Sequence, residues 1–217
     1  MPTSIPTVTL LVLLAASSAG AEAETGWVLE DADEDAGWAL YNKPVEGSSE
    51  PLYRLTGHTD AAPERVIGAL QIKFLDNRYL PKGQSRETLE RGEDFLISHL
   101  HVDAPIVSDR DTVVHVSWRT DPDTGVHRMS WGPPAHGAPP TAPGVERIIS
   151  RGFWLITPTA GGGADIVYQT HNEIGDNVPR WLIVRMLNRQ IVGELAILQA
   201  ILESGPARVA APGQPSD

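Results

Sequence analysis

The sequence predicts an α+β fold in which a curved antiparallel β-sheet wraps around one long C-terminal α-helix. Short stretches of alternating apolar and polar residues recur along the middle of the chain, with turn-forming residues between them. A single amphipathic helical pattern then runs from Val178 to Glu203. A helix of about 25 residues spans roughly 40 Å. It is therefore long enough to cover the open face of such a sheet.

The first residues of the chain have the composition of a secretory signal. Val8–Ala16 is an apolar run too short to cross a bilayer, and it is followed by the small-residue sites Ala19-Gly20-Ala21 and Ala21-Glu22-Ala23. No Lys or Arg precedes the run, so an uncleaved tail is the alternative interpretation. We expect a cleaved signal peptide, and hence a periplasmic or secreted protein.

These segments divide the chain into three parts. We expect the signal peptide over residues 1–21 or 1–23 and one folded domain over residues 24–203. Residues 204–217 are rich in Gly, Pro and Ala and have little to bury, which predicts a disordered tail.

Charge and cysteine content exclude several classes of function. The 217-residue chain contains no cysteine, which removes disulfides, thiolate metal sites and a cysteine nucleophile. Its formal net charge is −11 at pH 7, so nucleic-acid phosphates and anionic lipid head groups repel it. We therefore expect no nucleic-acid partner and only transient contact with membranes.

The first elements predicted after the signal are a β-hairpin and a helix. The acidic segment Glu30–Asp35 resembles a calcium loop only loosely, because its glycine falls one place late for EF-hand spacing, so a solvated turn is favoured. Trp38–Tyr41 and Leu52–Thr59 are short β-like runs joined by turn residues. A helical pattern then begins at Pro63 and stops near Pro81.

Strand patterns occupy most of residues 94–174. They comprise Asp94–Asp103, Asp111–Thr120, Val126–Trp131, Val145–Ile156 and Ala164–Ile174, with a Pro/Gly-rich loop at Gly132–Gly144. Alternation in the first two predicts an inward face made of Leu96, Ser98, Leu100, Val102, Val114, Val116 and Trp118. If the sheet bends strongly, an elongated hollow remains under the C-terminal helix. Periodicity leaves a completely filled core open as the alternative.

Several passages resemble START (StAR-related lipid transfer) domains. The stretch Pro105–Val114 resembles the S-R-D-x-V passage of that family, with Asp109 inserted between Ser and Arg. Ala164–Ile183 resembles its last strand, its G-x-(I/L)-P turn and the start of its final helix. Asp31–Tyr41 resembles its opening strand and Pro143–Arg147 a late strand. Together the similarity covers about residues 27–203.

This resemblance implies a helix-grip fold, as in the START/Bet v 1-like superfamily, with a lipid-sized tunnel beneath the C-terminal helix. It implies a monomeric protein without cofactor or catalytic activity that binds a lipid, sterol or related amphiphile and carries it through an aqueous compartment. The N-terminal helix of animal members is missing or very short here. The inward strand positions also lack the buried Arg and acidic pair of some sterol-binding relatives, which puts a cholesterol-like binding mode in doubt.

The expected ligand contacts lie on the inward strand faces and on the C-terminal helix. They are Leu96, Ser98, Leu100, Thr112, Val114, Val116, Trp118, Arg78, Ile183, Met186, Leu187 and Gln190. The polar residues Ser98, Thr112, Gln190 and Arg78 are candidates to bind a ligand hydroxyl or carboxylate. The Pro/Gly-rich loop Gly132–Gly144, together with the helix, is the expected gate.

Other chemistry finds little support in the residue pattern. His99, His101 and Asp103 share one strand face, but that face is predicted to point outward, so we expect no metal site. A G-x-S-x-G elbow is missing, and Arg110-Asp111 is interpreted as a structural ion pair. The remaining alternatives are an enzyme similar to the aromatase/cyclases, which needs acid–base groups in the tunnel, and a ligand-sensing subunit.

Overall fold

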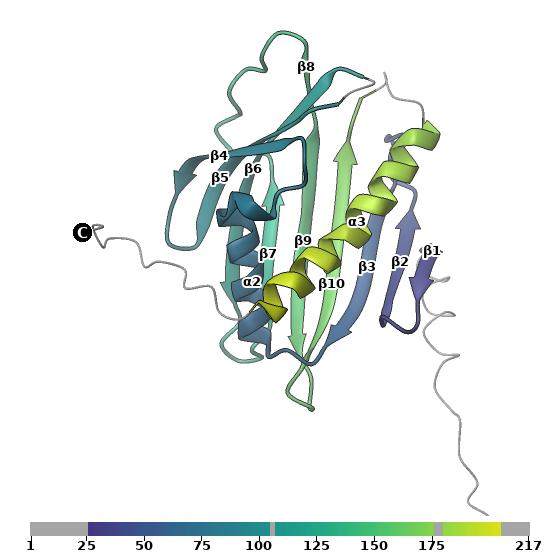
Figure 1. Ribbon diagram of the computed structural model, residues 1–217, viewed down its shortest axis with the longest axis vertical. Coiled ribbons are helices and arrows are strands. Elements are labelled where there is room, and N and C mark those ends of the chain that lie inside the picture. The colour runs from purple at the N-terminus through teal and green to yellow at the C-terminus, as the bar shows by residue number, and fades with distance from the viewer. Residues whose placement is uncertain (1–25, 105–106, 176–179, 205–217) are drawn as a thin grey trace, which may run out of the picture.

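The computed structural model describes residues 26–104, 107–175 and 180–204. It contains one curved sheet of ten strands and two α-helices (Figure 1). The predicted signal peptide and nearly all of the predicted tail lie outside the described residues. No helix in the part of the chain that the structure describes has both the length and the apolar character needed to cross a membrane.

The sheet has the strand order β1-β2-β3-β10-β9-β7-β6-β5-β4, and every neighbouring pair in this order is antiparallel. The short strand β8 pairs with β6 in parallel. The strands are β1 (Val28–Asp33), β2 (Trp38–Lys43), β3 (Leu52–Thr59), β4 (Gln84–Arg91), β5 (Phe95–Val102), β6 (Asp109–Thr120), β7 (His127–Gly132), β8 (Val145–Arg147), β9 (Ile149–Pro158) and β10 (Ala164–Glu173).

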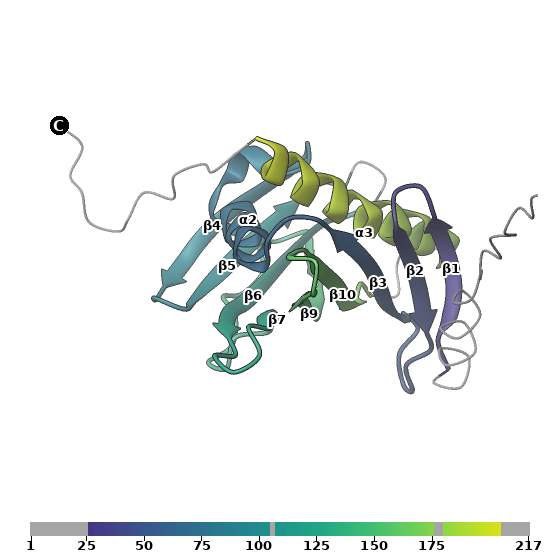
Figure 2. The same ribbon diagram turned by 90° about the horizontal axis from the view of Figure 1, so that it is seen from below.

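Both helices lie on the concave face of the sheet (Figure 2). They are α2 (Pro63–Leu75) and α3 (Arg180–Glu203). The helix α3 crosses the sheet diagonally, and α2 lies beside its C-terminal half (Figure 1). This arrangement confirms the predicted helix-grip fold, with the long terminal helix held against a bent antiparallel sheet.

One hydrophobic cluster joins the helices to the concave face. Leu40, Leu55, Leu96, Val116, Met129, Trp154 and Ile156 contribute from the strands, and Val66, Leu70, Ile191, Leu198 and Ile201 from the helices. The alternation within β5 and β6 correctly predicted which of their side chains face inward. For example, Leu96 of β5 lies opposite Val116 of β6, and both side chains are fully buried. Burial of this shared face holds α2 and α3 in place.

The structure corrects four predicted boundaries. Part of the acidic segment forms the exposed edge strand β1 and not a turn. The polar strand β4, whose sequence shows no alternation of apolar and polar residues, was not predicted. The stretch Val145–Ile156 is divided at Ile148 into β8 and β9. The helix α2 ends at Leu75 and not near Pro81, because Asp76 adopts an extended conformation and its carboxylate caps a short 3-10 turn at Asn77–Tyr79.

A close approach of backbone and ring shapes the middle of the sheet. The Trp131 ring lies against Gly152, where an added Cβ would come within 2.3 Å of the ring and 2.2 Å of the Gln169 carbonyl oxygen. Only glycine fits there. The indole Nε1 of Trp131 donates to Ser150 Oγ at 3.0 Å, which fixes the ring on the concave face.

Candidate functional site

A cavity of about 560 Å³ lies between α3, α2 and the concave face of the sheet. This volume falls within the range of about 300–1,000 Å³ that is usual for sites burying most of a small ligand. A completely filled core, which periodicity had left open, is therefore ruled out. The exposed residues Pro81, Lys82, Arg189 and Gln190 border the cavity and mark its opening, between α3 and the segment that precedes β4.

Five of the predicted ligand contacts line this cavity: Ser98, Leu100, Thr112, Val114 and Gln190. They come from β5, β6 and α3, which the fold brings together from distant parts of the sequence. Their contact with a ligand stays a prediction.

Other predicted contacts lie elsewhere in the described structure. Leu96, Val116 and Leu187 belong to the packed hydrophobic cluster, and Trp118 packs against that cluster. Arg78 is largely exposed and pairs with Asp76, their Nη2 and Oδ2 atoms being 2.5 Å apart. Strand alternation identified the correct face, but only one end of each strand reaches the cavity. The side chains of Ile183 and Met186 lie outside the described residues.

The structure adds a buried ion pair that the sequence analysis missed. Lys73 of α2 and Glu194 of α3 are in direct contact in the cavity wall, with side chains 10% and 14% exposed. The Lys73 Nζ atom lies 6.0 Å from the centre of the Trp154 ring. Burial, reinforced by the nearby Arg86, lowers the pKa of Lys73 to about 7.

The signal for this pair was present in the helical periodicity. The buried residues of α2 include Val66, Leu70 and Lys73, so the lysine occupies a position of the apolar stripe. Glu194 follows Ile191 by three residues in the same way on α3. A charged residue in an apolar stripe indicates a partner on the facing element, since an unpaired buried charge is costly.

Arg86 forms a second cationic part of the wall. Its Nη1 donates to the backbone carbonyl oxygens of Lys73 at 2.8 Å and Phe74 at 2.9 Å, at the C-terminal end of α2. Burial lowers the pKa of Arg86 to about 10. The register places Arg86 opposite Leu100 and Leu100 opposite Thr112. These three residues therefore form a row across β4, β5 and β6.

Three buried polar atoms of the lining have no hydrogen-bond partner within the described residues. They are the indole Nε1 of Trp154, the hydroxyl Oγ1 of Thr112 and Oε2 of Glu194, of which the last forms the ion pair with Lys73. Leaving such a group unpaired costs about 1–3 kcal/mol. Tyr168 also lines the cavity, and burial raises its pKa to about 12, so it stays a neutral phenol. The lining thus offers polar groups that a bound molecule can satisfy.

Arg110 and Asp111 do not form the pair with each other that the sequence analysis expected. Adjacent strand residues point to opposite faces, and Arg110 lies on the inward face with its Nη2 atom 3.1 Å from Oε2 of Glu146. The Arg110 side chain is 5% exposed. The partner Glu146 belongs to β8 and is 33% exposed, and neither residue lines the described cavity. The doubt about a cholesterol-like binding mode, which concerned Leu96–Val102 and Val114–Trp118, stays a prediction.

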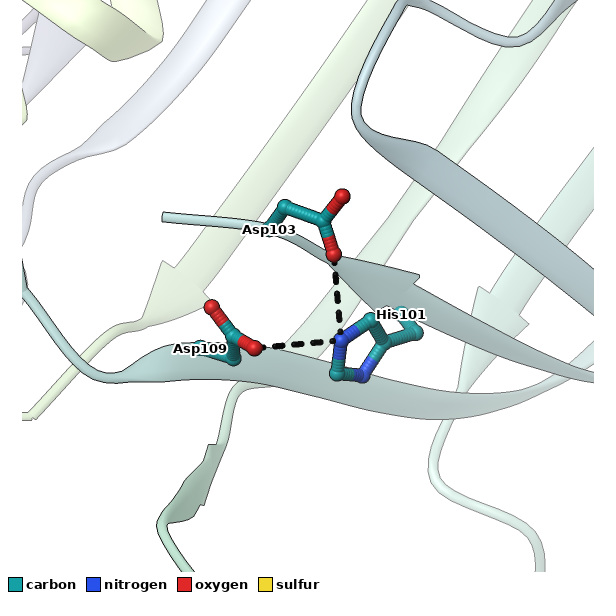
Figure 3. Close-up of side chains that lie close together, drawn as sticks. All are labelled: His101, Asp103 and Asp109. Carbon is teal, nitrogen blue, oxygen red and sulfur yellow. Dashed lines mark ion pairs between the residues drawn. The ribbon is translucent and has the colours of Figure 1, made fainter. Parts of the chain in front are cut away.

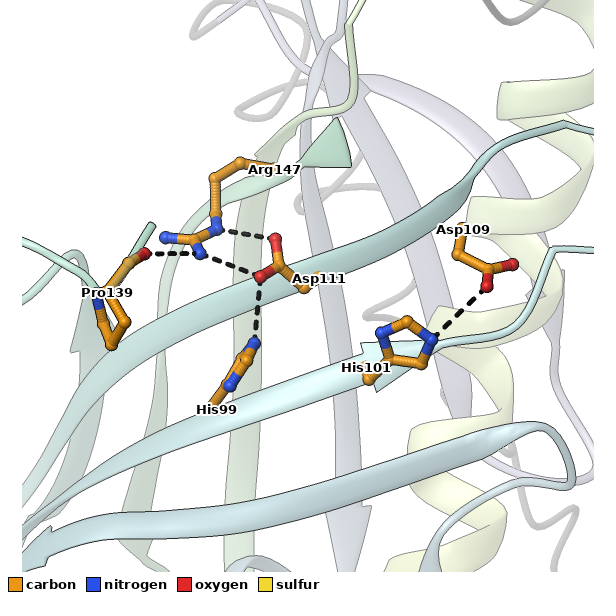
Figure 4. Close-up of polar contacts among 6 residues, drawn as sticks. All are labelled: His99, His101, Asp109, Asp111, Pro139 and Arg147. Carbon is orange, nitrogen blue, oxygen red and sulfur yellow. Dashed lines mark hydrogen bonds and ion pairs between the residues drawn. The ribbon is translucent and has the colours of Figure 1, made fainter. Parts of the chain in front are cut away.

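Asp111 organises the outer face of the sheet (Figure 4). Arg147 donates to both of its carboxylate oxygens, at 2.6 and 2.8 Å, and His99 Nε2 lies 2.9 Å from Oδ2. Burial alone would raise the pKa of Asp111, but hydrogen bonds from Arg147 and His99 outweigh burial and lower it. Asp111 is therefore an ionised anchor.

The same anchor holds the Pro/Gly-rich loop away from the cavity. Arg147 Nη2 also donates to the carbonyl oxygen of Pro139 at 2.9 Å (Figure 4). No residue of 133–144 lines the described cavity. The prediction that this loop forms the gate is therefore wrong for the state described, because the loop is attached to the outer face. The segment Leu80–Lys82 borders the cavity instead.

The histidines considered as metal ligands lie on the outer face, as the alternation predicted. His101 Nε2 lies 3.4 Å from Asp103 Oδ1 and 3.5 Å from Asp109 Oδ2 (Figure 3). These three side chains could together approach one ion, but Asp103 is 69% exposed and all three lie away from the cavity. His99 contacts Asp111 instead, so the three residues weighed in the sequence analysis, His99, His101 and Asp103, do not form a cluster.

Comparisons of sequence identify partial relatives. The chain is 26% identical over 164 residues to Rho GTPase-activating protein 7 of Rattus norvegicus, of which it spans only 14% of the length. It is 29% identical over 154 residues to an uncharacterized protein of Pseudomonas aeruginosa, covering 69% of this chain and 74% of that protein. No family model matches the sequence.

Comparisons of structure place the fold. The crystal structure of a STAR-related lipid transfer protein from Xanthomonas axonopodis superposes with a TM-score of 0.68 and 28% identity, over 82% of this chain and 99% of that one. Human StAR-related lipid transfer protein 5 has the same fold, with a TM-score of 0.66 and 19% identity over 88% and 97% of the two chains. The curved sheet and the terminal helix held against it are shared with both proteins, and this similarity supports a START domain.

Proposed function

We propose that this protein binds one lipid, sterol or related amphiphile in the cavity beneath α3 and carries it through an aqueous compartment. The single observation that supports this proposal is the open volume of about 560 Å³ inside an otherwise packed fold. Moving an apolar tail into water costs about 0.8 kcal/mol per methylene group. A protein that covers the tail lowers the barrier to its transfer between membranes by a large part of that cost.

The proposed place of action is the periplasm or the outside of the cell. The apolar N-terminal run and the small-residue sites that follow it support this proposal. The net charge of −11 supports a monomer that touches membranes briefly and does not bind nucleic acid. Detection of the mature chain, beginning at Glu22 or Glu24, in a periplasmic fraction is the expected result.

The test of binding is the identification of lipids that co-purify with the protein. Mass spectrometry of organic extracts should recover one chemical class of amphiphile in near-equal molar ratio to the protein. The variant Ser98→Phe places a ring in the cavity, because Ser98 is 2% exposed and lines it. We expect this variant to lose the co-purified molecule.

The matched control is Ser117→Phe, the same substitution on the outward face of β6. It should retain the bound molecule. Loss from both variants, or retention by both, would contradict the assignment of the cavity. Recovery of no apolar molecule from the wild type, combined with no binding of fluorescent sterol or fatty acid, would refute the proposed function.

A second candidate is an enzyme that converts its ligand on the same scaffold. The sequence analysis argued against an enzyme because the predicted lining was apolar and offered no acid–base groups. The contact between Lys73 and Glu194 favours an enzyme, because this pair is an acid–base couple inside the cavity. We nevertheless propose a carrier. A carrier predicts that the ligand recovered after long incubation with the protein has an unchanged mass. A change in mass that Glu194→Gln abolishes would establish the enzyme.

A further inference from the structure

The cavity has the opposite charge to the rest of the protein. Among the described residues that line it, the cations are Lys73, Lys82, Arg86 and Arg189, and the one anion is Glu194. The chain as a whole carries a formal charge of −11. Four positive groups and one negative group of an acidic protein thus line this cavity, where they attract an anion and repel a cation.

Apart from the Glu194 carboxylate, the charged side chains at the inner end of the cavity and the Trp154 indole are hydrogen-bond donors. Lysine and arginine side chains and the indole N–H donate and accept nothing. Lys73 and Trp154 lie close together, with the ammonium nitrogen 6.0 Å from the centre of the ring, and Arg86 is fixed beside them by the carbonyl oxygens at the end of α2. Trp154 is fully buried and its Nε1 has no partner within the described structure. Such a donor set fits an acceptor that has no proton to give.

The protein's own carboxylate already occupies this place. Glu194 contacts Lys73 from α3, and it shows which chemistry the ammonium group accepts there. A ligand carboxylate would take up the same interaction and would compete with Glu194 for it. Burial lowers the pKa of Lys73 to about 7, so a second anion beside it also stabilises its charged form.

We propose that the bound amphiphile is a long-chain carboxylate, with its head group between Lys73, Arg86 and the Trp154 indole and its tail along the apolar part of the cavity. This inference rests on the proposed function and names the class of its ligand. Lys82 and Arg189 at the opening attract the head group during entry. Glu194 acts as the internal anion that the ligand displaces.

The experiment is competitive displacement of a fluorescent fatty acid from delipidated protein. The competitors are hexadecanoic acid, hexadecan-1-ol and hexadecylamine, which share a chain length, and butyrate, which has the head group without the tail. We expect the acid to compete about tenfold more strongly than the alcohol, the difference made by one charge-assisted hydrogen bond. The amine and butyrate should be the weakest.

Two variants with opposite expected effects separate head-group recognition from a structural ion pair. Lys73→Met should weaken binding of the acid about tenfold and leave the alcohol unchanged, whereas Glu194→Gln should strengthen binding of the acid because the competing carboxylate is gone. A pair that only supports the fold would weaken binding in both variants. Arg119→Gln, an exposed arginine outside the cavity lining, is the control for a lost positive charge.

The double variant Lys73→Met/Glu194→Gln leaves no unpaired buried charge, so it keeps the test valid if Lys73→Met does not fold. It should prefer the acid over the alcohol less than the wild type does, because only Arg86 and the Trp154 indole then remain to bind the head group. The inference is overturned, and the proposed function kept, if wild-type protein binds the alcohol or the amine as tightly as the acid. Both fail together if none of the long-chain probes binds.

Discussion

The ion pair between Lys73 and Glu194 makes a strong prediction about folding stability. Replacing Lys73 by Met leaves the Glu194 carboxylate in a wall where both side chains are more than four-fifths buried. Removing one partner of a buried pair costs about 3–5 kcal/mol, and we expect about 3 here because the cavity opens to solvent. For a domain of this size that corresponds to about 6–12 °C in Tm.

The double variant tests whether the two charges interact. Glu194→Leu alone should also lose about 3 kcal/mol, but Lys73→Met/Glu194→Leu should return to within about 1 kcal/mol of the wild type, since a matched apolar pair replaces a buried ion pair at little net cost. Urea denaturation of delipidated protein measures all four stabilities, and delipidation matters because a bound ligand adds to the apparent stability. Strictly additive single effects would refute the pairing.

The same structure makes three further predictions. The difference in folding stability between wild type and Lys73→Met should shift in favour of the wild type as pH rises from about 7 to 10. In this range the unfolded lysine, with a pKa of 10.5, stays protonated, whereas burial lowers the pKa of folded Lys73 to about 7. Urea titrations at three pH values measure this shift, and a constant difference would contradict it. Gly152→Ala should cost about 1–3 kcal/mol by thermal denaturation, because its Cβ overlaps the Gln169 carbonyl oxygen and the Trp131 ring. An unchanged Tm would contradict the close approach described for this part of the sheet. Asp111→Asn should cost about 2 kcal/mol and raise amide exchange in residues 133–144 with ligand binding intact; a loop as protected as in the wild type would show that another contact holds it.

Much of the fold could be predicted because its central elements bury one face each. The alternation of β5 and β6, and the apolar pattern of α3, follow from local burial and appear in the order of the residues. The edge strands β1 and β4 could not be predicted in this way. Their side chains are mostly exposed on both faces, so their residues carry no periodic pattern, and backbone pairing with β2 and β5 decides their conformation.

The candidate site was predicted only in part, for a related reason. Ser98 and Leu96 share one face of β5, yet Ser98 lines the cavity and Leu96 packs in the core. Alternation tells which way a side chain points but not what lies opposite it. That depends on the distance between α3 and each part of the bent sheet.

From the sequence alone, the fold class, the inward faces of the central strands and the acidic character of the chain could be determined, because each depends on composition or on neighbouring residues. The tertiary structure decided that a cavity remains and that Lys73 and Glu194, 121 positions apart in the sequence, meet in its wall. It also decided that the Gly132–Gly144 loop is attached to the outer face. These features depend on how separate elements are placed relative to one another, and local periodicity contains no information about that placement.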